Sequence, residues 1–338
     1  MEKFDNFITK YNLRDLFNKT IKMLKYTWKN SLLLSTAFFL VFGLFAAFYL
    51  PALFGWLADT LRSQEINSDN LLEVFVLPTI VRFLFFLFVQ SLFMVFLRAA
   101  ISLNTFYIAH GKQIELKDIV LEVLYKKYAR LLLQALIIFL MLSAIVFGGM
   151  LLLIAISGVI TNFFSSEVLN QAQGVLEYIV GVPILILFIW ILISFFFAPE
   201  VVVYRDNKVF DSIKRSFRLV KGNWWRVVGI TLLIYLILVF AINIIVNPIT
   251  FGVGIGSSMN MAEDISMQNA GVENLIAVFS AYSRMTFAFG LSTLLSGVLY
   301  HLIFPVFISL LYLDLEVRKG DLTQSEGQSS TSEHNYTN

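Results

Sequence analysis

The sequence contains no cysteine, which excludes disulfide bridges, thiolate catalysis and zinc sites built on thiolates. Histidine is nearly as scarce, and His110, His301 and His334 lie too far apart to suggest a metal site. Charged residues make up only 14% of the chain, whereas soluble domains carry about 25%. We therefore expect no metal and no other cofactor, and the shortage of charge points to a surface that faces lipid.

Apolar residues take the place of the missing charge: 58% of the chain is hydrophobic and 15% aromatic. A bilayer core of roughly 30 Å needs about 20 apolar residues in a helix. Six stretches reach this length, and we predict an all-α, polytopic membrane protein with six transmembrane helices. The stretches are about Ser31–Phe54, Val74–Phe96, Leu131–Ile160, Tyr178–Val203, Trp224–Val246 and Phe287–Tyr312.

Basic residues are distributed unevenly between the connecting segments. In the six-span arrangement, 22 of the 25 Lys and Arg residues fall on one side, in 1–30, 98–130, 204–226 and after the last span. The alternate loops are acidic and hold only Arg62 and Arg284. Cytoplasmic loops of membrane proteins carry the excess of Lys and Arg. We therefore expect both termini in the cytoplasm and the protein in the cytoplasmic (inner) membrane.

A weak repeat divides the chain into three units, about 12–98, 116–203 and 208–314. In the first and third units an Asp precedes, by thirteen residues, the Trp that opens a span, as in Asp15–Trp28 and Asp211–Trp224. Each unit is expected to consist of a basic amphipathic helix followed by a helical hairpin.

The segments that open these units combine an apolar stripe with a basic face. Such a helix lies in the headgroup plane, here against anionic lipid of the cytoplasmic leaflet. The basic residues expected there are Lys22, Lys25, Lys214, Arg215, Arg218 and Lys221. In the alternative, each segment simply continues the following span. Gly222-Asn223 favours a break in the third unit and Asn30-Ser31, to a lesser degree, in the first, whereas Lys127 falls on the apolar side in the second.

The membrane domain is expected to occupy residues 1–322. The remaining tail, 323–338, is rich in Ser and Thr and has no apolar face, so it is predicted to be disordered. Topology already explains the basic loops, and nucleic-acid binding is not expected.

Two segments carry a family resemblance: 197–230, FAPEVVVYRDNKVFDSIKRSFRLVKGNWWRVVGI, and 308–322, ISLLYLDLEVRKGDL. They resemble the glycerophosphoryl diester phosphodiesterase membrane-domain family and related YciC-like six-span bacterial membrane proteins of unknown function. The resemblance implies a six-span membrane fold. In the phosphodiesterases themselves, the chemistry belongs to a separate soluble barrel with metal-binding carboxylates. This chain consists of spans and short loops, so the resemblance implies no hydrolase activity.

Four polar residues in or beside the spans are candidates for binding lipid or another ligand. Arg82 lies inside the second span, where a charge marks a pathway, an ion pair or a side chain that snorkels to the interface. His301, in the sixth span, could relay protons, hold a lipid phosphate or hydrogen-bond another helix. Glu200 and Asp314 end spans on the basic side, and their simplest role is pairing with the basic helices.

These patterns favour a non-enzymatic membrane protein that binds or handles lipid or a small amphiphile. A transport version requires Arg82 and His301 to face a common interior. The alternative is an accessory or scaffolding subunit of a membrane complex, or a homo-oligomer. An intramembrane lipid-modifying enzyme using His301, Glu200 or Asp314 is less favoured, because no Ser–His pair, carboxylate pair or metal spacing accompanies them.

Overall fold

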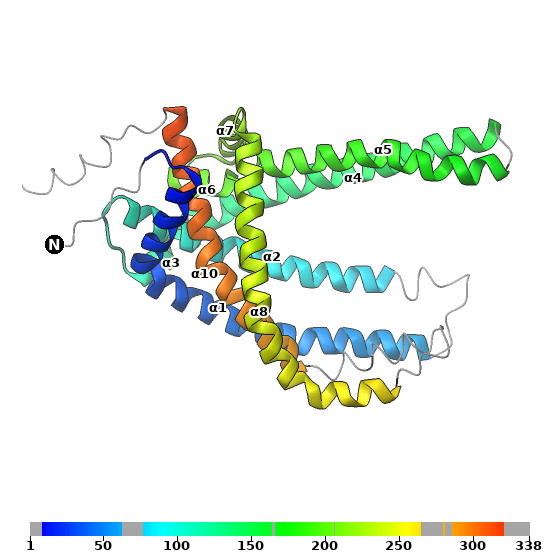
Figure 1. Ribbon diagram of the computed structural model, residues 1–338, viewed down its shortest axis with the longest axis horizontal. Helices are drawn as coiled ribbons and strands as arrows, with labels where there is room; N and C mark the ends of the chain where they lie inside the picture. Colours follow the sequence, from blue (N-terminus) through cyan, green and yellow to red (C-terminus); the bar gives the residue numbers. More distant parts are fainter. Residues whose placement is uncertain are drawn as a thin grey trace, which may run out of the picture.

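The computed structural model describes residues 9–62, 77–163, 166–205, 207–264, 280 and 286–320, and the regular structure within them is helical. The elements are α1 (Leu13–Arg62), α2 (Leu77–Ala109), α3 (Leu116–Glu122), the π-helical turn η2 (Val123–Lys127), α4 (Tyr128–Phe163), α5 (Ser166–Ser194), α6 (Ala198–Arg205), α7 (Val209–Val220), α8 (Trp224–Asp264) and α10 (Thr286–Lys319). Figure 1 shows their arrangement. The tail predicted to be disordered lies outside the described residues.

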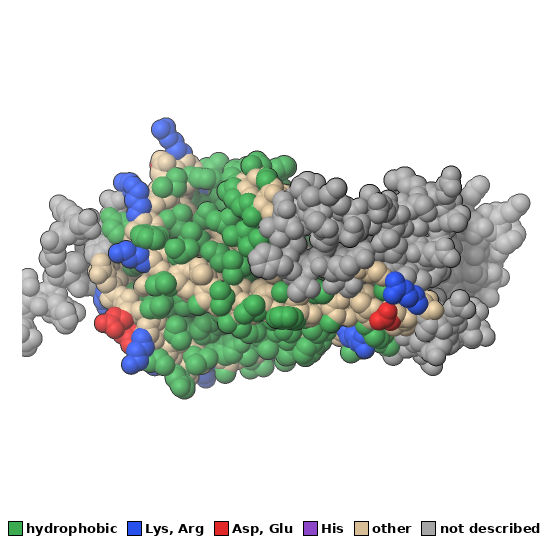
Figure 2. All heavy atoms as spheres, turned by 90° about the horizontal axis from the view of Figure 1, so that it is seen from below, with side chains coloured by type: hydrophobic (Ala, Val, Ile, Leu, Met, Phe, Trp, Pro, Cys, Tyr) green, Lys and Arg blue, Asp and Glu red, His purple; other side chains and the backbone are tan. Residues whose placement is uncertain are grey.

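Within the described residues, six helical segments are long and apolar enough to cross a membrane, which confirms the predicted all-α, polytopic fold. They are Leu13–Arg62, Val81–Ala109, Leu116–Gly149, Gly181–Arg205, Trp224–Ile249 and Gly290–Lys319. Large apolar side chains stay exposed on them, such as Phe48 at 71% and Ile244 at 72%. Figure 2 shows a broad hydrophobic surface between charged side chains near the two ends of the molecule. Lipid tails would cover this surface without a loss of hydrogen bonds.

The centre of the bundle is a close packing of α1 against α10. The backbone of Gly290 approaches Gly43 so closely that a Cβ atom on Gly43 would lie 3.1 Å from the Gly290 carbonyl oxygen. About two turns further along α10, the ring of Phe39 fills the space that a side chain at Gly297 would need. Small residues let membrane helices approach in this way, since packing rather than water exclusion holds them together.

The α4–α5 hairpin stands apart from this centre. In Figure 1, the later part of α2 and the base of the α4–α5 hairpin lie close together beside α6, and the two elements separate toward the beginning of α2 and the tip of the hairpin. Because a distance seen in projection cannot exceed the true distance, the far ends of α2 and the hairpin are well separated in space. Near their common end, the Tyr128 hydroxyl donates to the Leu92 carbonyl at 3.1 Å.

We call the end of the bundle that holds α3, η2, α6 and α7, with the beginning of α1 and the end of α10, the basic end. The predicted break in the third unit is confirmed there: α7 ends at Val220, Gly222 has a left-handed φ of 85°, and α8 begins at Trp224. Glycine adopts this conformation without a steric penalty. The three residues 221–223 therefore turn the chain from α7 into the span.

The predicted break at Asn30-Ser31 is wrong, because α1 runs unbroken through it. The Asn30 amide donates to the Asn104 side chain and to the Ile114 carbonyl, each at 3.4 Å, and Ser31 is fully buried. Polar residues that find partners on neighbouring segments no longer compete with the helix backbone. In the second unit, too, the opening helix runs into the span without a break, from α3 through η2 into α4.

The predicted fourth span also differs from the structure. Instead of one helix to about Val203, α5 ends at Ser194 and α6 begins at Ala198. The Ser216 hydroxyl on α7 donates to the Ser194 carbonyl at 2.8 Å and accepts from the Phe197 amide at 3.2 Å. One side chain thus satisfies an end of each helix, which stabilises the break in a place where water is excluded.

Candidate functional site

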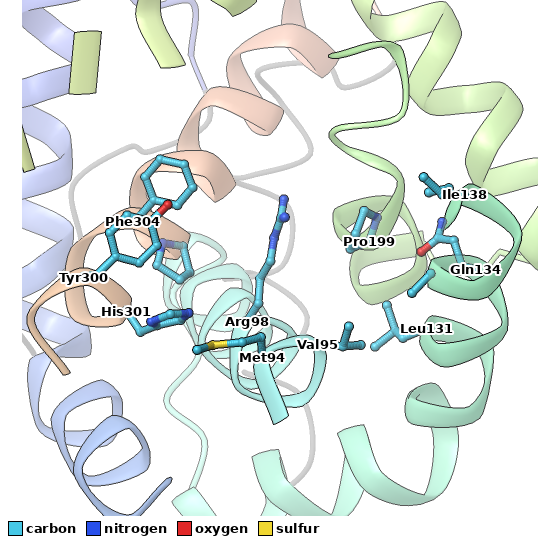
Figure 3. A pocket seen from close by; sticks show the side chains of 12 residues that line it. Met94, Val95, Arg98, Leu131, Gln134, Ile138, Pro199, Tyr300, His301 and Phe304 are labelled. Atoms are coloured by element: carbon cyan, nitrogen blue, oxygen red, sulfur yellow. The ribbon is translucent and has the colours of Figure 1, made fainter. Parts of the chain in front are cut away.

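A cavity of about 240 Å³ lies where α2, α4, α6 and α10 meet, at the narrow end of the space between α2 and the α4–α5 hairpin. Its walls are mainly apolar and come from three of the spans. The apolar lining includes Met94, Val95, Leu131, Ala135, Ile138 and Phe304. Four polar side chains, Arg98, Gln134, Tyr300 and His301, reach it from three different helices (Figure 3).

Arg98 is held at the cavity by Glu200, the acidic residue that the sequence singled out at the start of α6. The Arg98 Nε and Nη2 atoms bond the Glu200 carboxylate at 2.8–3.0 Å, and Nη2 also donates to the Phe196 carbonyl at 3.1 Å. The Glu200 side chain is fully buried, and that of Arg98 is 27% exposed. The pair is bidentate and its net charge is zero. In the described part of the chain, Arg98 Nη1 has no hydrogen-bond partner.

Gln134 and His301 bring the other free polar atoms to the cavity. Gln134 is buried, and its Nε2 donates to the Ser212 hydroxyl of α7 at 2.6 Å, whereas its Oε1 has no partner among the described residues. His301 Nδ1 lies 3.1 Å from the Gly297 carbonyl, and its ring lies 5.0 Å from that of Phe39. Because a carbonyl only accepts, Nδ1 carries the proton in this bond, and Nε2 of a neutral ring is then an acceptor.

Asp314 and Glu200 are paired, as expected, but not with the basic helices that open the repeat units. The Asp314 carboxylate is fully buried, lies 3.0 Å from Arg226 and 2.9 Å from Arg318, and accepts the Tyr11 amide at 2.7 Å. Arg226 is at the start of α8, and Arg318 lies one turn further along α10. Asp314 therefore ties the chain before α1 to α8 and α10, and its charge is balanced.

Glu316 is an ionic centre that the sequence reasoning missed. Its buried carboxylate bonds Arg205 at 2.8 Å and Arg215 at 2.6 Å, and it accepts the Tyr312 hydroxyl. Arg215 was expected to face lipid headgroups, yet its side chain is only 14% exposed because this pair draws it inward. The signal in the sequence was a second acid, two residues after Asp314, near the end of an apolar span.

Lys127, which falls on the apolar side of its predicted helix, is buried for a specific reason. Its ammonium group donates to the Val203 carbonyl and lies 3.3 Å from Glu122. Glu122 also accepts the Tyr107 hydroxyl at 2.9 Å. The π turn of η2 places Lys127 there, and such turns often mark sites where a side chain is redirected.

Arg82 lies away from the cavity. Its guanidinium stacks 3.6 Å from the centroid of the Trp56 ring, and its carbonyl accepts the Tyr49 hydroxyl at 2.8 Å. The sixteen residues between Arg82 and Arg98 correspond to about 24 Å along α2. A cation over an indole face stabilises the charge near the far end of the bundle. The structure therefore does not bring Arg82 to the cavity that His301 lines.

The other basic candidates line two grooves at the basic end, one of about 470 Å³ along α1 and one of about 420 Å³ along α7. Every residue that lines the α7 groove has a counterpart 196 positions earlier that lines the α1 groove. The matched pairs include Asp15 and Asp211, Ile21 and Phe217, Lys22 and Arg218, and Lys25 and Lys221. Lys22, Lys25, Lys214, Arg218 and Lys221 are exposed. The repeat thus reappears as two surfaces of similar composition, although α1 is continuous and α7 is not.

Tyr11 closes the inner side of the α1 groove. It is almost fully buried, and burial raises the pKa of its hydroxyl far above the usual value, with the nearby Asp314 carboxylate acting in the same direction. The phenol therefore stays neutral at physiological pH. Across the described ranges, no three His, Asp or Glu side chains gather as a metal site would require.

The fold and the apolar exterior define a polytopic α-helical membrane protein. A family described as a domain of unknown function, DUF7847, matches residues 20–312, and the chain belongs to that family. Neither a curated protein nor a solved structure matches the chain. Membership carries no activity with it, and the resemblance to the phosphodiesterase membrane-domain family stays a prediction.

Proposed function

We propose that this protein binds a lipid or small amphiphile inside the bilayer, in the cavity between α2, α4, α6 and α10. The observation that carries the proposal is the unpartnered Oε1 of Gln134, a buried residue that lines an apolar cavity together with Arg98. A buried polar atom without a partner costs free energy, and one at a cavity wall can regain a hydrogen bond from a ligand. Apolar walls with a few convergent polar groups are typical of small-molecule sites.

The surroundings of the cavity favour a ligand that arrives from the membrane. Because α2 and the α4–α5 hairpin diverge away from the cavity, a chain bound at its head can extend between them (Figure 1). The cavity at the narrow end of this space has mainly apolar walls, such as Leu131 and Ile138 on α4. An amphiphile with its head in the cavity and its tail in lipid fits both features without crossing the bilayer.

The distribution of charge supports an orientation with the basic end in the cytoplasm. Cytoplasmic leaflets are anionic, and each exposed Lys or Arg near such a surface contributes about 1 kcal/mol of attraction. The two basic grooves on α1 and α7 would meet the headgroups of that leaflet, with the protein in the cytoplasmic membrane. Trp225, 81% exposed beside the α7 groove, suits the same interface.

The binding role requires no catalysis and no transport. His301 contacts Gly297, Phe39 and the ring of Tyr300, and the Tyr300 phenol is the one acid–base group among these three contacts. The described contacts do not join His301 and Tyr300 into an acid–base pair, so they do not favour catalysis. A transport role that uses Arg82 together with His301 finds no support in their separate positions. A role as accessory subunit remains compatible with the fold, but no described feature favours it specifically.

Native mass spectrometry of the protein released with its surrounding lipid tests the proposal. The informative variant is Ala135→Trp, which places an indole in the cavity, and its matched control is Leu136→Trp, which places the same group on the exposed side of α4. A species retained at fixed stoichiometry should be lost in Ala135→Trp and kept in Leu136→Trp. Equal retention in both variants, or no retained species in the unmodified protein, would contradict the proposal.

A further inference from the structure

We infer that the ligand of the cavity carries an uncharged head with a free hydroxyl group, as in a lipid alcohol such as a monoacylglycerol, and not the anionic head of a phospholipid. The inference rests on the proposed function and specifies its ligand class. It follows from the charge of the cavity, from the hydrogen bonds that its walls leave unmade and from its size.

The charge of the cavity is already balanced. Arg98 is the only cation among the described residues that line it, and both Glu200 carboxylate oxygens lie within 3.0 Å of its guanidinium. An anionic head bound to Nη1 would sit on the opposite side of the same guanidinium from a fully buried carboxylate. Repulsion between two anions is strong where water is excluded. No second cation lines the described cavity to offset it.

The unmade hydrogen bonds require a ligand that both donates and accepts. Gln134 Oε1 offers an acceptor that has no partner among the described residues. Arg98 Nη1, which takes part in none of the bonds that the guanidinium makes to Glu200 and Phe196, offers a donor. The Tyr300 hydroxyl, which also lines the cavity, can donate or accept. His301 Nε2 offers a second acceptor when the ring is neutral, because Nδ1 then holds the proton of the bond to the Gly297 carbonyl. A phosphodiester or a carboxylate accepts only, so it would leave Gln134 Oε1 unpaired, and an ammonium head would leave Nη1 unpaired. A hydroxyl group donates and accepts at once and can complete both sides.

The size of the cavity agrees with a small head. A volume of about 240 Å³ corresponds to about eight water-sized groups at roughly 30 Å³ each. A head the size of glycerol and the first methylenes of its chain fill such a space. The rest of the chain would lie in the diverging space between α2 and the hairpin. A phosphate bearing a second polar group would need more room at the polar wall.

The test compares three ligands that differ in the donors and the charge of their heads. The full chain in detergent is titrated with a monoacylglycerol, with the same molecule capped as its dimethyl ether, and with phosphatidylmethanol, an anionic phosphodiester whose head has no donor. Bound species are counted by native mass spectrometry. The monoacylglycerol should bind one to one and at least about tenfold more tightly than the ether, since the ether cannot donate to Gln134. Gln134→Leu should abolish the difference, and Ala135→Trp should abolish the binding.

The other outcomes separate a failure of the proposed ligand class from a failure of the cavity as a binding site. Equal affinity for the alcohol and the ether, or tighter binding of phosphatidylmethanol that Ala135→Trp removes, overturns the inference and leaves the proposed function standing. If Ala135→Trp affects none of the three probes, the proposed function fails as well. The comparison of alcohol with ether is made on the unmodified chain, so it decides the matter even if Gln134→Leu fails to fold.

Discussion

Replacement of Glu316 by Gln should destabilise the protein strongly. Glu316 is the shared counter-ion of Arg205 and Arg215 at the junction of α6, α7 and α10, with Arg215 Nε at 2.9 Å and Nη2 at 2.6 Å. The amide keeps the shape of the side chain and removes its charge. Two guanidinium groups then lose the carboxylate that they share in a partly dry site, and the hydrogens of the new amide group face the N–H donors of these arginines.

The expected loss can be derived from the burial of the three groups. Removal of one partner from a buried ion pair costs about 3–5 kcal/mol, because the other charge is left uncompensated. Here the carboxylate is fully buried, whereas Arg205 is 32% and Arg215 14% exposed, so water recovers part of the cost. We therefore expect a loss near the lower limit, about 3 kcal/mol in the free energy of unfolding.

Titration with SDS in mixed micelles, followed by far-ultraviolet circular dichroism, measures this loss. The matched control is Asp59→Asn, which removes the acid from an exposed pair with Arg62 at 3.5 Å. Exposed pairs contribute roughly 0–1 kcal/mol, so the control should change little. If Glu316→Gln loses no more than Asp59→Asn, the buried triad does not hold the basic end together and the reasoning is refuted.

Two further predictions concern helix packing and the leaflet. Gly297→Ala should lower the free energy of unfolding by about 1–3 kcal/mol, since its Cβ would lie 2.2 Å from the Phe39 ring. Gly229→Ala, whose Cβ would meet no atom within 4 Å, should leave the free energy unchanged in the same titration. Equal effects of the two variants would contradict the close packing of α1 and α10. Neutralising the paired groove residues should lower the ratio of anionic to zwitterionic lipid that co-purifies, and an unchanged ratio would count against leaflet contact. The residues to change to Gln are Lys22, Lys25, Arg218 and Lys221.

The number of spans could be predicted from the sequence because hydrocarbon length imposes a local requirement. About 20 apolar residues must follow one another in each helix, whatever the helices do to one another. Gly222 is equally local, since a left-handed backbone at the end of a helix favours glycine. The break of the fourth span after Ser194 was not visible, because the group that stabilises it, Ser216, lies on another helix.

In the candidate site too, the sequence predicts single residues but not the contacts between helices. Glu200, Asp314 and His301 could be found because polar residues are rare in spans, but their partners could not. Glu200 bonds Arg98, 102 positions away, and the sequence reasoning had counted Arg98 among the loop residues. Gln134 is uncharged and drew no attention within an apolar run. Its importance comes from an oxygen left without a partner, which only the packed helices reveal.

The unbroken course of α1 has a mechanical consequence. Its 50 residues follow a helical path of about 75 Å, more than twice the thickness of a bilayer core, and the helix changes direction along this path without a break (Figure 1). No left-handed residue interrupts α1 as Gly222 interrupts the chain between α7 and α8. Lys22 and Lys25 lie in the first part of α1, so a change in its packing against α10 would be transmitted through a continuous helix to the membrane surface.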